Sequence, residues 1–99
     1  MRIADIALKV RSKNAGPFWV TVDVFCGSAS AYDRLRTIPT AAIARLYGQP
    51  EQMLKRFDIP DLHVIKISFP RPVVQGSRDD RDMHGAQWAH LLAEMPFAG

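Results

Sequence analysis

Between Pro17 and Cys26 the chain places an apolar residue at every second position, and this feature limits most strongly how it can fold. The apolar positions are Phe18, Val20, Val22, Val24 and Cys26. A period of two indicates a β-strand with one buried face. Trp19 and Phe25 accompany the polar residues on the other side, which predicts that other elements cover part of that side. We therefore expect a central strand here.

Other strands are predicted at four places. A strand near residues 6–11 leads into the central one, and an alternating strand over 64–69 is closed by two prolines. Residues 53–57 have apolar spacing that fits both a strand and a helix, and we assign them to a strand. Residues 94–97 add a short terminal strand.

Three short helices complete the predicted elements. The first covers 29–36 and begins with Ser30 and Asp33, which resemble an N-terminal capping box. The second begins at a threonine near Pro39 and ends at Gly48, because glycine readily takes the left-handed conformation that closes a helix. The third covers 85–92, where the apolar spacing is helical.

About four strands and two to three short helices in this order predict an α+β domain with a mostly antiparallel sheet. With 99 residues, 47% of them hydrophobic, the chain has the size and composition of one globular domain spanning 1–99. A chain this short buries only roughly 60–65% of its unfolded surface. A partner subunit, or a second copy in a homo-oligomer, is therefore a natural source of further burial.

Composition also restricts the compartment. The single Cys26 lies in an apolar run and has no second cysteine for an internal disulfide, which favours a reducing environment. Charges at Arg2, Asp5 and Lys9 interrupt any signal-peptide core, and no stretch has the length and hydropathy of a membrane span. We expect a cytoplasmic protein that is neither exported nor embedded in a membrane.

The charge pattern bears on nucleic acid as a partner. The net charge of +3 comes from 13 basic and 10 acidic residues, spread along the chain apart from a mixed cluster at 78–82. Nucleic-acid binding normally needs a basic patch or stripe. The linear sequence shows none, so nucleic acid is not an expected partner. Because the net charge is nevertheless positive, nucleic-acid binding stays an alternative hypothesis, and it predicts salt-dependent retention on DNA.

The first candidate site is the segment 11–17, which we interpret as a turn ahead of the central strand. It reads Arg11-Ser12-Lys13-Asn14-Ala15-Gly16-Pro17. Arginine and lysine can bind a carboxylate or phosphate, and backbone N–H groups beside a glycine can complete an anion site. The alternative is an ordinary solvated turn, since Asn, Gly and Pro are common turn residues.

The second candidate site is the loop 70–84, with the sequence PRPVVQGSRDDRDMH. Loops of this length are uncommon in compact domains and are often functional. One reading is a surface on which Arg and Asp neutralise one another. In the other, Asp80 or Asp82 orients Arg11 or Arg71, or acts as a general base. His84 beside these acids is a candidate proton carrier.

A metal or cofactor site is not expected. His84 and His90 are six residues apart, which does not place them on one helical face, and His63 is distant in sequence. The sequence has no CxxC or HExxH motif and no carboxylate at ligand spacing. No Ser-His-Asp or Cys-His arrangement can be assembled either.

Several strings along the chain resemble a small bacterial family of unknown function. They are RSKNAGPF at 11–18, IARLYG at 43–48, IKISFPRP at 65–72, and DRD and GAQ at 80–82 and 85–87. Members of that family occur alone or fused behind acyclic terpene utilisation (AtuA-type) proteins. A weaker similarity links the chain to the ferredoxin-like C-terminal domain of the AtuA-type proteins, which opens with an RSGDKG-type turn. Lys13 and Asn14 replace the Gly and Asp of that turn.

The resemblance implies a ferredoxin-like sandwich that partners an AtuA-type large subunit in carboxylic acid or acyl-CoA catabolism. It implies a small anionic ligand and the small subunit of a two-component enzyme of the lyase or hydratase type. The implied substrate-binding residues are polar or glycine: Arg11, Ser12, Lys13, Asn14, Gly16, Arg71, Gly76, Ser77, Arg81 and Gln87. Asp80, Asp82 and the adjoining His84 are the catalytic candidates.

This hypothesis requires the two candidate segments to converge into one polar pocket at a subunit interface. Its alternative is a non-catalytic assembly or regulatory domain without a ligand, because no nucleophile or base is recognisable in the sequence. In that case the polar segments only stabilise an interface.

Overall fold

The computed structural model describes residues 1–71 and 87–97. Its strands are β1 (Lys9–Asn14), β2 (Trp19–Phe25), β3 (Lys55–Ile59) and β4 (Val64–Pro70). Its α-helices are α1 (Ala29–Leu35), α2 (Thr40–Tyr47) and α3 (Gln87–Ala93), and 3₁₀ turns lie at Ile3–Asp5, Glu51–Met53 and Pro60–Leu62. No α-helix in this described part has the length and hydropathy that crossing a bilayer requires.

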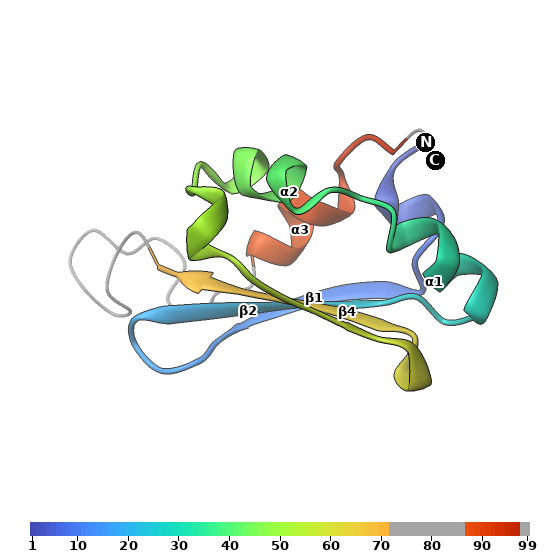
Figure 1. Ribbon diagram of the computed structural model, residues 1–99, viewed down its shortest axis with the longest axis horizontal. Helices are drawn as coiled ribbons and strands as arrows, with labels where there is room; N and C mark the ends of the chain where they lie inside the picture. The colour runs from blue at the N-terminus through green and yellow to red at the C-terminus, as the bar shows by residue number, and fades with distance from the viewer. Residues whose placement is uncertain (72–86, 98–99) are drawn as a thin grey trace.

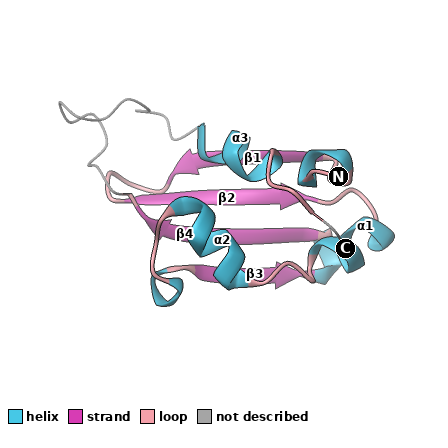
Figure 2. Cartoon of the chain, turned by 90° about the horizontal axis from the view of Figure 1, so that it is seen from above, coloured by secondary structure: helices cyan, strands magenta, loops and turns pink. Residues whose placement is uncertain are grey.

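The strands form an antiparallel sheet in the order β1-β2-β4-β3. Two hairpins, β1–β2 and β3–β4, meet where β2 pairs with β4. The three helices all lie on one face of this sheet, as Figure 1 shows from the side and Figure 2 from above. This two-layer arrangement confirms the predicted α+β class and is compatible with a ferredoxin-like sandwich.

The two central strands supply the middle of the core. Val20 lies opposite Phe69 and Val22 opposite Ile67, and all four side chains are fully buried under the helices. The predicted central strand is therefore confirmed. Phe18 is the exception: it precedes the strand, lies in a turn, and is 59% exposed.

The first strand differs from its predicted position. The sequence predicts a strand near 6–11 and a turn over 11–17, whereas β1 continues to Asn14 and the turn covers 15–18. Pairing with β2 extends along the whole of β1, so cross-strand hydrogen bonds override the turn preference of Asn14. Gly16, with φ of 78°, supplies the left-handed residue of the turn.

The helix boundaries follow local chemistry. α1 begins after Ser28, whose Oγ accepts a hydrogen bond from the Ala31 N–H at 3.1 Å. The cap is therefore Ser28 and not the predicted Ser30, because Ser28 has the extended backbone that an N-cap needs. α2 begins after Pro39, and Gly48 ends it with φ of 65°, as predicted.

The later elements are found with shifted bounds. The strand predicted over 53–57 is β3, and the helix predicted over 85–92 corresponds to α3. The strand predicted over 94–97 is reduced to an isolated bridge between Arg2 and Pro96. One bridge is too short to count as a strand of the sheet.

An aromatic cluster fixes α3 against α2 and the sheet. The Tyr47 ring stacks on Phe69 with centroids 4.7 Å apart, and Trp88 meets both rings edge-on. The Tyr47 hydroxyl donates to the Trp88 carbonyl oxygen at 2.7 Å. Burial raises the pKa of Tyr47, which keeps the hydroxyl protonated as a donor. Trp88 is thus partly buried and packs against the core.

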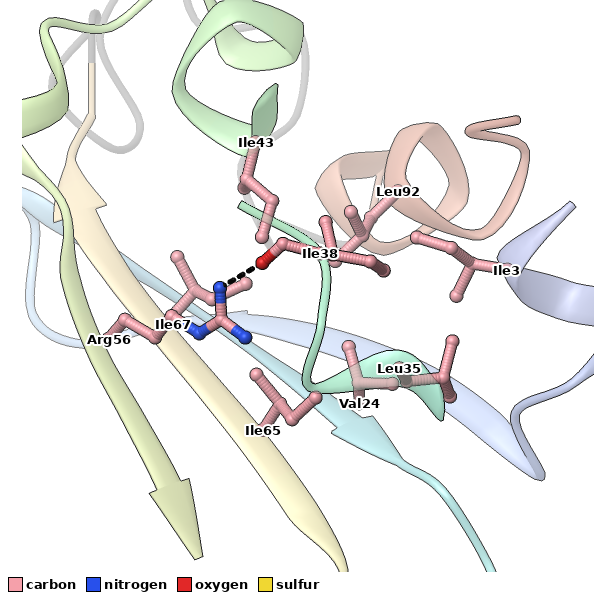
Figure 3. A pocket seen from close by; sticks show the side chains of 9 residues that line it. All are labelled: Ile3, Val24, Leu35, Ile38, Ile43, Arg56, Ile65, Ile67 and Leu92. Atoms are coloured by element: carbon pink, nitrogen blue, oxygen red, sulfur yellow. Dashed lines mark hydrogen bonds between the residues drawn. The ribbon is translucent and has the colours of Figure 1, made fainter. Parts of the chain in front are cut away.

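Arg56 ties the helix layer to the edge of the sheet. Its side chain, only 13% exposed, passes from β3 beneath the connection between α1 and α2, as Figure 3 shows. The guanidinium donates to the backbone oxygens of Ile38 and, at 2.9 Å, of Arg36. Its Nε also pairs with Asp58 at 2.9 Å. One planar cation thereby holds the connection in place.

We predict that Arg56→Ala lowers the free energy of unfolding by about 2–3 kcal/mol, because carbonyls that a charged donor satisfies lose their partner. Urea denaturation followed by circular dichroism measures the loss. Arg36→Ala is the matched control, since its side chain pairs with Asp33 on the surface, and it should cost less than about 1 kcal/mol. Equal losses in the two variants would contradict this role of Arg56.

Candidate functional site

Neighbouring side chains of β1 point to opposite faces of the sheet, and this divides the first candidate segment. Ser12 and Asn14 are half-buried and face the helices, whereas Arg11 and Lys13 are exposed on the other face. The interpretation of 11–17 as a turn is therefore wrong for 11–14, which belong to β1, and correct for 15–17. Its polar residues form two groups with different surroundings.

Ser12 holds the first turn of α3. Its Oγ accepts a hydrogen bond from the Ala89 N–H at 2.9 Å. The first N–H groups of a helix have no partner within the helix, and a side-chain oxygen commonly satisfies one of them. Here that oxygen comes from a strand 77 residues earlier in the chain. Ser12 therefore acts as a tertiary cap.

Asn14 forms a side-chain hydrogen bond with the residue that follows β4. The Arg71 guanidinium donates to Asn14 Oδ1. The Arg71 N–H donates to the Phe18 carbonyl oxygen at 2.8 Å, which fixes the residue beside the β1–β2 turn. The two candidate segments thus meet within one chain at Asn14 and Arg71, on the side of the sheet that carries the helices.

Of the other predicted site residues, two lie in the described part of the chain. Gly16 is exposed in the 15–18 turn, and Gln87 is exposed as the first residue of α3. The remaining predicted residues lie outside the described part of the chain and stay predictions: Gly76, Ser77, Asp80, Arg81, Asp82 and His84.

A surface hollow lies on the face of the sheet opposite the helices. We call this the helix-free face, because no described α-helix covers it (Figure 1). The hollow has a volume of about 320 Å³ and is lined by Arg11, Lys13, Asp23 and Phe25 from β1 and β2, and Ser12, whose side chain faces the helices, also borders it. Its volume is at the small end of the range for ligand pockets.

Positive charge dominates the hollow. Arg11 lies opposite Asp23 in the strand register, and Lys13 lies opposite Thr21. Within the described residues neither Arg11 nor Lys13 forms an ion pair with a carboxylate. Both cations are therefore available to an anion, with Asp23 as a hydrogen-bond acceptor beside them.

Sequence reasoning missed three contributors to this surface. Asp23 and Phe25 line the hollow from β2, and the Lys9 ammonium lies 4.9 Å from the Phe25 ring centroid. The alternation of β1 and β2 could have revealed them, because residues opposite one another in a hairpin share a face. In the described part of the chain, the contact on Phe25 is the side chain of Lys9 from the neighbouring strand β1, and no α-helix covers this side of the sheet.

A second cavity lies inside the core and is not a ligand site. Figure 3 shows its lining, which is aliphatic apart from Arg56. Its volume of about 10 Å³ leaves room for at most about one water molecule. A space this small and apolar is a packing defect.

Cys26 is buried at the end of the central strand. Its Sγ lies 3.8 Å from the Val24 carbonyl oxygen. Burial, followed by the charge of Asp58, raises the pKa of the Cys26 thiol to about 11. The thiolate is the nucleophilic form, so Cys26 is poorly suited to covalent catalysis near neutral pH.

Comparison with known proteins places the chain in a family context. The family model described as Domain of unknown function (DUF4387) matches residues 3–96. No curated protein and no solved structure matches the chain. The family match confirms the expectation of a small domain of unknown function, while the association with AtuA-type proteins stays a prediction.

We predict that Ser12→Ala lowers the free energy of unfolding by about 1 kcal/mol, the typical cost of losing a helix cap. Chemical denaturation measures it. Ser30→Ala, on the exposed side of α1, is the control and should change stability by less than about 0.5 kcal/mol. A loss no larger in Ser12→Ala than in Ser30→Ala would show that the strand hydroxyl does not support α3.

We also predict that Cys26 resists alkylation in the folded protein. At pH 8 a thiol of pKa about 11 has a thiolate fraction roughly a hundredfold below that of a free thiol, and burial slows access further. Iodoacetamide labelling followed by mass spectrometry should show slow reaction without urea and fast reaction in urea. Rapid labelling of the native chain would contradict this assignment.

Proposed function

The chain belongs to the DUF4387 family, and we propose that it is a small accessory or subunit domain that binds an anionic group on its helix-free face. We further propose that it partners an AtuA-type large subunit in carboxylic acid or acyl-CoA catabolism. The observation that supports binding is the hollow in which Arg11 and Lys13 lie without an ion pair among the described residues. The resemblance of the sequence motifs supports the choice of partner.

The chemistry of the hollow fits a carboxylate or a phosphate. Arginine offers a planar pair of N–H donors that matches either group, and lysine adds a mobile positive charge. The carboxylate of Asp23 can accept a hydrogen bond from a ligand hydroxyl or amide. A volume of about 320 Å³ suits one end of an acyl-CoA or a small branched acid. The large subunit would enclose the remainder.

The proposal assigns a different role to the polar residues on the helix side. Ser12 and Asn14 form hydrogen bonds with α3 and Arg71. These contacts set the positions of residues 71 and 87–89 next to β1. We propose that they support the domain, whereas Arg11 and Lys13 contact the ligand.

The described residues of the hollow include one carboxylate and no histidine. We therefore propose binding and orientation as the contribution of Arg11 and Lys13 to a lyase- or hydratase-type reaction. The alternative function is a non-catalytic assembly domain. Exposed apolar residues on the helix-free face, such as Phe57 at 52% exposure, favour that alternative because they suit a protein contact.

We predict that Arg11→Ala and Lys13→Ala each weaken the binding of a branched-chain acyl-CoA or its free acid by about tenfold, since each removes a charge-assisted contact. Isothermal titration calorimetry measures this affinity when the ligand is titrated into the complex of the chain with its AtuA-type partner. Arg45→Ala is the control, because Arg45 is exposed on α2 in the helix layer.

The same titration separates the two functions. Association with the large subunit that is unchanged by ligand and by both variants would favour the assembly domain. Ligand binding that is equal in Arg11→Ala, Arg45→Ala and the wild type would contradict the anion site.

A further inference from the structure

The helix-free face carries far more positive charge than the rest of the molecule. Strand alternation and register place five cations on it: Lys9, Arg11, Lys13, Lys55 and Lys66. Among the described residues of these strands, Asp23 is the one carboxylate on the same face. The excess of four positive charges is larger than the net charge of +3 of the whole chain.

These cations are separated in the sequence but adjacent in the sheet. Arg11, Asp23, Lys66 and Phe57 lie in one row across the four strands. The neighbouring rows contribute the remaining lysines. A search along the chain for a basic run cannot find this patch, because each strand shows a charge only at alternate positions.

Three aromatic rings lie among the cations. Phe57 is 52% exposed on β3, and Trp19 and Phe25 are half-buried on β2. The Lys55 ammonium lies 5.1 Å from the Trp19 ring centroid, and Lys9 lies similarly over Phe25. Within the described residues these two lysines contact rings and form no ion pair.

We propose that the helix-free face binds single-stranded nucleic acid. Single strands are recognised by cations that track the phosphates and by aromatic rings on which the bases stack. The four-stranded sheet has cations on three neighbouring rows and rings on two strands, β2 and β3, and so supplies both contacts. The lysines over Trp19 and Phe25 can move to phosphates while bases take their place on the rings.

Other occupants fit this face less well. A second copy of the chain would bring two cationic faces together, and like charges repel. An acidic protein surface would match the charge, but four of the five cations are lysines, and lysine is depleted from protein interfaces. A double helix would present stacked bases that the rings cannot reach. The single strand is the partner that uses cations and rings together.

This inference goes beyond the anion-binding hollow and can fail separately from it. The hollow is built from β1 and β2, whereas the proposed nucleic-acid surface also needs Lys55, Phe57 and Lys66 on β3 and β4. Substitutions on these two strands therefore test the larger surface without changing any residue that lines the hollow.

The test is fluorescence anisotropy with labelled oligo-U and oligo-dT of about 12 nucleotides. The wild-type chain should bind with a Kd in the range of roughly 10⁻⁶–10⁻⁴ M, and log K should fall linearly with log salt. A duplex of the same length and poly-L-glutamate should compete weakly. Failure to bind either oligonucleotide at about 0.05 M salt would overturn the proposal. Competition by polyglutamate equal to that by an unlabelled oligonucleotide would instead indicate a nonspecific or protein-directed surface.

Variants locate the binding surface. Lys55→Glu and Lys66→Glu should weaken binding, with the salt slope reduced by about 0.7 for each lost phosphate contact. Arg45→Glu, with the same charge change on the helix layer, should have little effect. Phe57→Ala should lower affinity by about fivefold or more. The control is Leu91→Ala, because Leu91 is 44% exposed on α3 in the helix layer, and this variant should have little effect. Equal effects of test and control variants would overturn the proposal while leaving anion binding at Arg11 and Lys13 untouched.

Discussion

The pairing of β2 with β4 is the constraint on which the rest of the structure depends. It gathers Val20, Val22, Ile67 and Phe69 on one face, and burying each such side chain contributes roughly 1.5–3 kcal/mol. Because this face must be covered, all three helices lie on the same side of the sheet (Figure 1). The opposite side of the same strands carries charged and aromatic residues together with the hydroxyl pair Thr21 and Ser68. The helix-free face is thus a consequence of how the core is closed.

Much of the fold could be predicted because its signals are local. The alternation from Val20 to Val24 gave the central strand, and Gly48 gave the end of a helix. The errors concern element boundaries, which depend on strand pairing and on local backbone conformation. β1 continues to Asn14 because β2 pairs with it, although Asn14 is a typical turn residue. Ser28 rather than Ser30 caps α1 because its backbone is extended at that point.

The candidate site was less predictable, since its geometry depends on contacts between distant segments. The sequence indicated that Arg11 and Asn14 belong to one functional segment. In the predicted turn their side chains could have contacted the same ligand, but in the strand they face opposite sides of the sheet. The bond from Ala89 to Ser12 spans 77 residues, and no spacing rule reveals it. The patch that includes Lys66 is likewise assembled only when the register of the strands is known.

Side chains of β1 alternate between the two faces of the sheet, and this separates residues of the helix-free face from residues that support the helix layer. An edge strand normally needs charged residues to discourage pairing with other chains, and Lys9 and Lys13 meet that need while also lining the helix-free face. Ser12, which lies between Arg11 and Lys13 in the sequence, supports α3 instead. Because adjacent positions serve opposite faces, binding at the surface and stability of the helix layer can be altered independently. Substitutions at Arg11 and Lys13 therefore change the helix-free face and leave the contact of Ser12 with α3 in place.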